Sequence, residues 1–497
     1  MKQRFILALL IVFAGFASCK DDTEVVQAPV ISGLENAYTV LENAELKLTP
    51  TIKNDNNSTY IWQLDGKEVA KTLDYVFVQS TPGYYKLVLK VANKGGVDEK
   101  TISIIVESKE MRFETTTHSL LLLELPEYMK GNENIEWKIV ETASEIYRFS
   151  QMTGVETPMF IAAKEGKYLL QVSSGDLKEI VSIVVTKATE EPSPYIANVF
   201  DYLPAPGQFV NKMPQYETGD THADMVVKVA EALVGEDASI ITLGGWGGYV
   251  TFGFDHTIVN VAGRRDFRIE GNAYANNSEP GIIMVSYDAN RNGKPDDEWY
   301  EIKGSANFGA ENEEWYQSAV DHGNDVNTYR NFEMTYYKPK GETPEEVGQE
   351  GTGTDGAYID DYIRWTNNKG KEGYKVKNKT HTQSYYPLWE SENKITFKGI
   401  RLAQNGVDES GQGSFFILKS FNYGYADNHS NIDDGSAIDI DWAIDKDGNK
   451  VNLPGIDFVK VYTGVDQENG WAGENSTEIG KASNLHMLGE SINTINK

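Results

Sequence analysis

Residues 83–106, GYYKLVLKVANKGGVDEKTISIIV, contain two runs in which apolar side chains recur at every second position. The first run covers residues 84–91 and the second covers residues 101–106. Because successive side chains of a β-strand point to opposite faces of a sheet, this spacing predicts two strands that each place one face in a core. These strands set the expected fold class of the chain, which is all-β.

Neighbouring residues extend this pattern to a sandwich between residues 29 and 108. Short apolar runs at 46–50 and 60–64 predict further strands, and Asp65-Gly66 is typical of a hairpin turn. A Trp in the third strand and a Gly-Tyr-Tyr entry to a late strand fit a seven-stranded sandwich of about 80 residues. The segment resembles PKD-type immunoglobulin-like modules.

The same plan recurs in residues 109–187. Trp137 lies in one strand-like run, Gly166-Lys-Tyr168 opens another, and an apolar run at 180–185 closes the segment. We therefore predict a second Ig-like domain at 109–187. Residues 188–195, which are rich in Glu and Pro, are predicted to be a linker.

Residues 196–497 are predicted to form one large C-terminal domain. A helix is expected at 221–233, while the other regular segments have strand patterns, which favours a jelly-roll-like β-sandwich with long loops. Residues 305–393 are poor in strand patterns and rich in Tyr, Trp, Asn and Gly. Long loops over a rigid sandwich commonly carry binding residues, so this stretch is the expected binding region.

Charge and cysteine content restrict the partners. The chain has 46 Lys and Arg against 74 Asp and Glu, which gives a formal net charge of −28. A negative field of this size repels phosphate backbones and anionic membrane surfaces, so nucleic acid is not an expected partner. The single cysteine cannot form a disulfide within the chain, and stability must come from packing and bound ions.

The N-terminal residues predict export and lipidation. Lys2 and Arg4 precede an apolar run at 5–13, and small residues lead to Cys19, as in a secretory signal peptide. We predict a signal peptide at 1–18, lipidation of Cys19 and a tether at 19–28. The following Lys-Asp-Asp resembles the signal that places lipoproteins on the outer surface of Bacteroidetes-type bacteria. The expected location is the outer membrane, lipid-anchored and facing the extracellular side, with no other membrane contact; an ordinary secretion signal is the alternative.

Residues 288–298, DANRNGKPDDE, form the strongest local motif. Oxygen-bearing side chains at its first, third and fifth positions, followed by Gly, match the start of a Ca²⁺ loop. Trp299 stands where an EF-hand requires Glu, so the motif predicts a shortened loop that holds a structural Ca²⁺; the alternative is an Asn-Gly turn without metal. The expected ligands are Asp288, Asn290, Asn292, Asp296 and Asp297.

Catalytic motifs are few. Asp439 and Asp441 alternate within an acidic group that also contains Asp427, Asp433 and Asp434, but such residues are more often turn formers or ion ligands than an acid and base pair. The chain has no G-x-S-x-G elbow and no His pair with zinc-binding spacing, and its only Cys is the predicted lipidation site. We therefore predict that the protein is not an enzyme.

Aromatic residues in polar, loop-like context are the main candidates for ligand binding. Their rings offer a broad flat contact, which suits a sugar face or a planar macrocycle with amide arms. Packing as loop anchors is the alternative for each of them. The candidates are Trp315, Tyr316, Tyr336, Tyr337, Tyr358, Trp365, Tyr385, Tyr386, Trp389 and Trp471.

Several runs of the C-terminal domain together resemble a family of Bacteroidetes-type surface lipoproteins. These runs include GGWGGYVTFGFDHTIVN at 244–260, RRDFRIEGNAY at 264–274, the stretch 278–302, and NGVDESGQGSFFILKSFNYGYADN at 405–428. The family resembles the BtuH-type cobalamin-binding lipoproteins. The resemblance implies a corrinoid (cobalamin) as ligand rather than cofactor, and an outer-membrane TonB-dependent transporter as partner. A glycan-binding lipoprotein and an adhesin are the alternatives.

Overall fold

The computed structural model describes residues 26–130, 134–154, 157–175, 177–348, 358–378 and 380–495. Strands account for 44% and helices for 7% of the chain, which confirms the all-β prediction. The predicted signal peptide, the lipidation site Cys19 and most of the tether lie outside the described residues. Within these residues, no helix combines the length and apolar character needed to cross a membrane.

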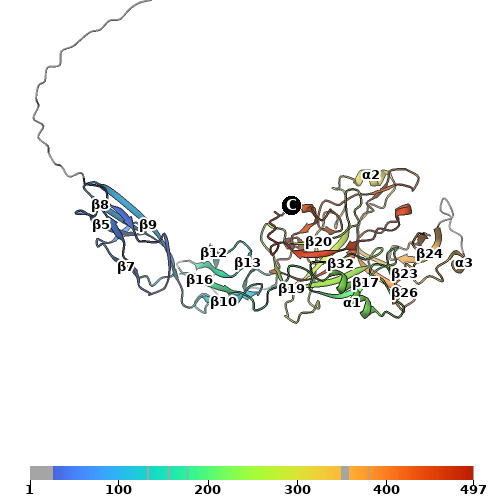
Figure 1. Cartoon of the computed structure of the whole chain (residues 1–497), viewed down its shortest axis with the longest axis horizontal. Coiled ribbons are helices and arrows are strands. Elements are labelled where there is room, and N and C mark those ends of the chain that lie inside the picture. Colours follow the sequence, from blue (N-terminus) through green and yellow to red (C-terminus); the bar gives the residue numbers. More distant parts are fainter. Residues whose placement is uncertain are drawn as a thin grey trace, which may run out of the picture. The chain divides into compact units, whose positions relative to one another are not determined.

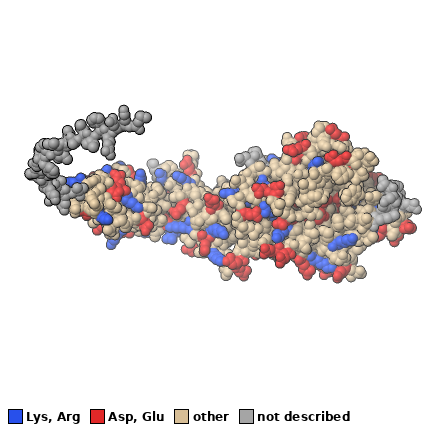
Figure 2. Space-filling view, turned by 45° about the horizontal axis from the view of Figure 1, so that its top comes forward, with Lys and Arg blue, Asp and Glu red and all other residues tan. Residues whose placement is uncertain are grey.

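The chain divides into two compact units. Of the described residues, unit 1 contains those within 26–112, 134–140 and 169–182, and unit 2 contains those within 113–130, 141–168 and 183–495. Figure 1 labels the principal elements of both units. Acidic and basic side chains are intermixed over the face shown in Figure 2.

The first module of unit 1 is the predicted sandwich. Its five-stranded sheet has the order β2-β9-β8-β5-β6, and the pairs β1-β4 and β3-β7 complete it. The two alternating runs within residues 83–106 become β8 and β9, which pair antiparallel with Leu87 opposite Ile102. The strands are β1 (Val30–Ser32), β2 (Ala37–Leu41), β3 (Leu46–Leu48), β4 (Thr51–Lys53), β5 (Thr59–Leu64), β6 (Lys67–Ala70), β7 (Tyr75–Phe77), β8 (Gly83–Asn93) and β9 (Gly96–Glu107).

The core of this module follows the predicted alternation. Leu87 and Leu89 are buried on one face of β8, together with Trp62 of β5. The predicted hairpin turn joins β5 to β6, and both Asp65 (φ 47°) and Gly66 (φ 82°) adopt the left-handed conformation that such a turn requires. Burial of these apolar side chains is the main stabilising contribution of the module.

The described residues between 112 and 186 form seven further strands. A four-stranded sheet has the order β10-β16-β15-β12 and a three-stranded sheet has the order β11-β14-β13. The strands are β10 (Arg112–Thr116), β11 (Leu121–Leu122), β12 (Glu136–Glu141), β13 (Tyr147–Gln151), β14 (Pro158–Ala162), β15 (Gly166–Ser174) and β16 (Leu177–Thr186).

The C-terminal part of unit 2 is organised around a large antiparallel sheet. Its order is β17-β19-β32-β21-β22-β31, and β29 also pairs with β21. Smaller sheets have the orders β30-β20-β34 and β18-β33. The strands are β17 (Asn198–Leu203), β18 (Ile241–Thr242), β19 (Tyr249–Val259), β20 (Phe267–Glu270), β21 (Gly281–Ser286), β22 (Trp299–Ile302), β29 (Tyr425–Ala426), β30 (Ala437–Ile438), β31 (Ala443–Ile444), β32 (Gly455–Thr463), β33 (Glu478–Ile479) and β34 (Lys481–Asn484).

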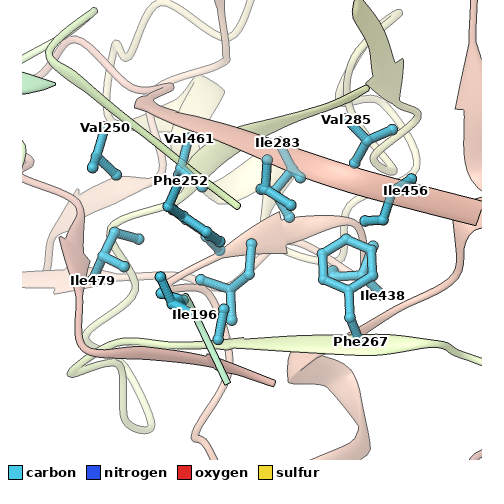
Figure 3. Close-up of a cluster of buried hydrophobic side chains, with 14 of the residues drawn as sticks. Ile196, Val250, Phe252, Phe267, Ile283, Val285, Ile438, Ile456, Val461 and Ile479 are labelled. Atoms are coloured by element: carbon cyan, nitrogen blue, oxygen red, sulfur yellow. The ribbon is translucent and has the colours of Figure 1, made fainter. Parts of the chain in front are cut away.

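These sheets share one hydrophobic core, part of which is shown in Figure 3. Phe252, Ile283 and Val461 of the large sheet meet Phe267 and Ile438 of a smaller sheet in this cluster. The arrangement has the sandwich character that was predicted from the alternating patterns.

The predicted helix is α1 (His222–Leu233), which also packs on this core through Met225, Val229 and Leu233. Thr221 begins it, because its side chain accepts the N–H of Asp224 and the Asp224 carboxylate accepts the N–H of Thr221, which forms a capping box. The remaining helices are short: α2 (Tyr316–Asp321), α3 (Pro344–Val347), η1 (Asp434–Ser436), η2 (Ile440–Trp442) and η3 (Gly470–Ala472).

The prediction that residues 305–393 are mainly loop is wrong. This stretch supplies most of a second sheet with the order β25-β24-β23-β26, formed by β23 (Tyr329–Tyr337), β24 (Tyr358–Asn367), β25 (Glu372–Asn378) and β26 (Lys394–Arg401). Phe332, Met334 and Tyr336 do alternate into its core, but Tyr residues also stand at outer positions of β23, which masks the period. A short hairpin, β27 (Gly406–Asp408) with β28 (Phe416–Leu418), lies beyond β26 in the chain.

Candidate functional site

A cleft in unit 2 combines aromatic rings with charged side chains. It consists of two neighbouring pockets that share Glu468, between the β24-β25 part of the second sheet and the segment 466–474. We call the pocket of 240 Å³ the basic pocket and the pocket of 400 Å³ the acidic pocket. Volumes in this range suit small-molecule parts rather than a large ligand enclosed as a whole.

Two glycine-containing loops build the outer wall of the acidic pocket. At Gly470 (φ +60°), a Cβ atom would lie 2.4 Å from the carbonyl oxygen of Gly413, so only glycine permits this close approach. The Trp471 indole Nε1–H then donates to the carbonyl oxygen of Ser414 at 2.9 Å. These contacts fix the position of the Trp471 ring at the pocket.

Asp408 holds the second of these loops in place. Its carboxylate accepts the backbone N–H of Ser410 at 3.1 Å and of Gly413 at 2.6 Å, in addition to the Ser410 hydroxyl. These hydrogen bonds, led by that of the Ser410 side chain, lower the pKa of Asp408 to about 2. The loop is therefore preorganised at any physiological pH.

Three rings line the acidic pocket. Trp471 is 65% exposed, which leaves its face available for stacking, whereas Tyr385 is almost completely buried. The Tyr385 ring meets Tyr362 edge to face at 5.4 Å, and Tyr358 lines the same pocket. The acidic pocket thus has a rigid aromatic wall and one exposed aromatic platform.

The charges of this pocket are all negative among the described residues that line it. Asp360, Glu468 and Glu474 are its ionisable acids, and no Lys, Arg or His joins them in its lining. Glu474 is buried and accepts the backbone N–H of Gln208 at 2.7 Å. Burial raises the pKa of Glu474 to about 7, with a contribution from the charge of Glu468 and against the opposing effect of Lys375.

The basic pocket contains the side chains of Lys369, Lys371, Lys375 and Arg401. Lys375 is buried and forms an ion pair with Glu468 at 2.7 Å, which connects the two pockets. Arg401 pairs with Asp325 at 3.0 Å. The aromatic residues of this pocket are Tyr329, Phe332, Tyr336, Trp365 and Tyr374.

The predicted ligand-binding rings divide between this cleft and the hydrophobic cores. Tyr358, Tyr385 and Trp471 line the acidic pocket, and Tyr336 and Trp365 line the basic pocket. The remaining candidates lie elsewhere: Trp315 and Tyr316 at one core, Tyr386 in the core of the second sheet, Trp389 stacked between Tyr202 and Tyr216, and Tyr337 under the Arg364 guanidinium.

Sequence reasoning missed the polar half of the cleft. Lys375, Glu468, Glu474 and Gln208 were not candidates, because none belongs to a local motif. One signal was present: Glu468 and Glu474 flank Asn-Gly-Trp-Ala-Gly, which combines a turn with an aromatic residue.

The predicted calcium loop is compact and rich in oxygen atoms. Asp288 accepts the backbone N–H of Asn292 at 3.1 Å and of Gly293 at 2.8 Å. The side-chain amides of Asn290 and Asn292 donate to Asp296 at 3.0–3.1 Å. One carboxylate oxygen of Asp297, Oδ2, is buried without a hydrogen-bond partner. A cation could replace the amide donors if both Asn side chains turned their oxygens inward.

A second group of carboxylates was not predicted as a site. Carboxylate oxygens of Glu279, Asp427 and Glu478 lie within 4.8 Å of one another. Among the described residues, none of the three forms an ion pair. Burial is the largest cause that raises the pKa of Asp427 to about 7 and that of Glu478 to about 8. Such a group is stable when it shares protons or holds a cation.

The other members of the predicted acidic group have structural contacts. Asp433 and Asp439 begin η1 and η2 by accepting backbone N–H groups. Asp441 pairs with Arg148 at 2.7 Å, and the guanidinium also reaches Asn260 and Asn452. Asp433 and Asp439 thus act as turn formers, while Asp441 is an ion-pair partner of an arginine.

Comparison with known proteins supports the N-terminal assignment. A family model described as a PKD-like domain matches residues 29–93, which confirms the PKD-like and Ig-like character of this module. A search of the curated proteins finds no match.

Similar solved structures include tandem Ig domains. The I-band fragment I67–I69 of titin has 14% identity and a TM-score of 0.16, and the match covers 33% of this chain and 66% of the fragment. The N-terminal Ig1-2 module of Drosophila Receptor Protein Tyrosine Phosphatase DLAR has 13% identity and a TM-score of 0.15, over 32% of this chain and 99% of that module. A quinonprotein alcohol dehydrogenase-like protein of Bacteroides thetaiotaomicron has 15% identity and a TM-score of 0.16, over 35% of this chain and 44% of its own.

Proposed function

We propose that this protein is a cell-surface lipoprotein that binds a corrinoid in the cleft of unit 2 and assists its uptake through a TonB-dependent outer-membrane transporter. The observation that carries the proposal is the cleft itself, where an exposed Trp471 adjoins several amide side chains and the ion pair of the buried Lys375 with Glu468. Its PKD-like and Ig-like N-terminal modules are compatible with a cell-surface binding protein.

The chemistry of the cleft suits a corrinoid. A corrin ring has a broad, mostly apolar face that can lie on Trp471, and its peripheral amides need hydrogen-bond partners such as Gln208, Asn378 and Gln412. A macrocycle is too broad to enter a pocket of 400 Å³ completely, so only one edge with its amide arms would insert. The sequence resemblance supplies the identity of the ligand.

Anchoring is part of the same proposal. A lipid on Cys19 would hold the chain at the outer membrane, with the N-terminal modules next to the anchor in sequence and the cleft in the last part of the chain. A ligand bound in an open cleft can be transferred to a transporter without unfolding of the binding protein.

Equilibrium dialysis with cyanocobalamin tests the proposal. The chain that starts at residue 20, and therefore lacks lipid, is expected to retain the ligand at micromolar concentration. The Trp471→Ala variant is expected to lose about tenfold in affinity, since ring stacking on an exposed platform contributes on the order of 1–2 kcal/mol. A folded protein that leaves micromolar cyanocobalamin free would refute corrinoid binding.

A glycan is the second candidate, and the acidic pocket favours it. An exposed Trp beside Asp360, Glu468 and Glu474 offers both a stacking surface and acceptors for hydroxyl groups. Glycan-array binding that Trp471→Ala abolishes, combined with no corrinoid binding, would select this candidate.

We also propose a structural Ca²⁺ in the loop that contains Asp288, Asn290, Asn292, Asp296 and Asp297. Millimolar Ca²⁺ is expected to raise the melting temperature of the wild-type protein and not of Asp288→Ala. An equal shift of the melting temperature in both proteins would show that Ca²⁺ binds elsewhere. The buried carboxylate group is then the site to test, with Glu478→Gln as the matched variant.

A further inference from the structure

The two pockets of the cleft differ in charge. The acidic pocket has three carboxylate residues and no cationic residue among the described residues that line it. The basic pocket has Lys369, Lys371, Lys375 and Arg401 against Asp325, Asp466 and Glu468. This is an unusual concentration of cations in a chain whose formal net charge is −28.

Two of the four cations are already neutralised. Lys375 is paired with Glu468 at 2.7 Å and also faces the charges of Glu474 and Asp466. Arg401 is paired with Asp325 at 3.0 Å. The acidic residues of the basic pocket therefore lie next to Lys375 and Arg401.

The other two cations lie on the turn between β24 and β25. The Asn367 side-chain oxygen accepts the backbone N–H of Lys369 and of Lys371, each at 3.0 Å, and Gly370 (φ +72°) completes the turn. The Lys369 ammonium lies 5.0 Å from the centre of the Tyr329 ring, which directs it toward the pocket. Neither lysine forms an ion pair in the part of the chain that the structure describes.

We propose that the basic pocket receives an anionic phosphate group of the ligand, with Lys369 and Lys371 as the residues that determine this specificity. The inference rests on the proposed function, and it names the form of corrinoid that is preferred. A complete cobalamin carries a phosphodiester in its nucleotide loop, whereas cobinamide lacks the nucleotide loop and this phosphodiester. Two ammonium groups that no carboxylate neutralises attract the phosphate and can donate charge-assisted hydrogen bonds to its oxygens.

Competition between cyanocobalamin and dicyanocobinamide tests this inference. Wild-type protein is expected to bind cyanocobalamin about tenfold more tightly than dicyanocobinamide at low salt, and less selectively at 0.5 M salt because exposed charges are screened. Lys369→Gln/Lys371→Gln is expected to reduce the preference to about twofold or less. The matched control is Lys398→Gln/Lys446→Gln, which changes the net charge equally at two exposed residues outside both pockets and is expected to retain the preference.

The outcomes of this experiment separate the phosphate site from the proposed corrinoid binding on which it rests. Equal wild-type binding of the two corrinoids, or an equal loss for both in the double variant, would overturn the phosphate site and leave corrinoid binding intact. If neither corrinoid binds, the proposed function fails, and calorimetric titration with inorganic pyrophosphate decides the anion site. A heat of pyrophosphate binding that disappears in Lys369→Gln/Lys371→Gln but not in the control variant would support the anion site. The absence of such heat with wild-type protein would overturn it.

Discussion

The PKD-like module and the cleft region of unit 2 differ in where they place charged residues. In residues 30–106, which the structure describes without a gap, no charged residue is buried, although Glu107 at the end of β9 is; ion pairs such as Lys90–Glu99 are exposed. Near the cleft, Lys375 and Lys377 are buried on β25 and pair with Glu468 and Glu342. Because burial of charge costs free energy unless each group is paired, the module depends on apolar packing, whereas the cleft region also depends on ion pairs made by buried lysines.

The largest expected effect is on the module. Trp62→Ala removes a fully buried ring that stacks on Tyr75 at 5.3 Å and donates to the carbonyl oxygen of Thr72, so we expect a loss of about 3–5 kcal/mol in the local free energy of unfolding. Hydrogen–deuterium exchange of peptides from residues 30–106 measures it. Ligand binding at the cleft is expected to be unchanged, and a tenfold loss of binding would show that the two regions are coupled.

Breaking a buried ion pair in unit 2 tests the role of paired charges. Arg148→Ala removes the guanidinium 2.7 Å from Asp441 and leaves Lys450, at 3.8 Å, as the nearby cation, and we expect a loss of about 3 kcal/mol in the free energy of unfolding of unit 2. Exchange protection of peptides from residues 435–460 reports this loss. Arg148→Met/Asp441→Leu, which removes both charges, is expected to recover part of the stability; a double variant less stable than Arg148→Ala would contradict this explanation.

The pH dependence of stability gives the next effect. Burial, assisted by the charge of Asp266, raises the pKa of Asp439 to about 7 in the folded protein, while an unfolded Asp titrates near 4. The folded state therefore binds this proton more tightly, and the free energy of unfolding is expected to decrease by about 2 kcal/mol from pH 5 to pH 8. Denaturant unfolding measures the slope, which Asp439→Asn should reduce; an unchanged slope in that variant would rule out Asp439 as the source.

Removing one exposed aromatic ring from the cleft and one from the module compares the two regions directly. Trp471→Ala at the cleft is expected to weaken ligand binding about tenfold while it changes the free energy of unfolding by less than about 0.5 kcal/mol, since the ring is 65% exposed. Tyr84→Ala, which removes a ring of the module that is 56% exposed, should affect neither quantity. If Trp471→Ala and Tyr84→Ala bind the ligand with similar affinity, Trp471 is not part of the binding site.

The smallest expected effect concerns the exposed ion pair of the module. Lys90→Gln breaks a pair with Glu99 at 2.8 Å in which both side chains are about half exposed. We expect a change of less than about 0.5 kcal/mol in the local free energy of unfolding. A loss above 1 kcal/mol would show that surface charge stabilises the module more than its geometry indicates.

Much of the fold could be predicted from local pattern. The strands β8 and β9, the turn at Asp65-Gly66 and the helix α1 all follow from residues that are close together in the sequence. The second sheet was missed because its hydrophobicity does not follow its burial. On β25 the buried positions are Lys375 and Lys377, while on β23 apolar and aromatic residues occupy outer as well as buried positions, so neither strand shows a clear alternation. About half of the aromatic residues predicted to bind ligand lie at the cleft. The others pack as loop anchors, because an aromatic residue in a polar stretch of sequence can serve either role.

By itself, the sequence determined the strands, their turns and the places where aromatic residues are frequent, because these properties depend on interactions between near neighbours. Only the tertiary structure decided that Lys375 meets Glu468, which lies 93 residues further along the chain. Such a contact depends on how two sheets and a loop pack together, and no local period encodes that packing. The same is true of Glu279, Asp427 and Glu478, whose close approach is visible only when β21, β29 and β33 are assembled.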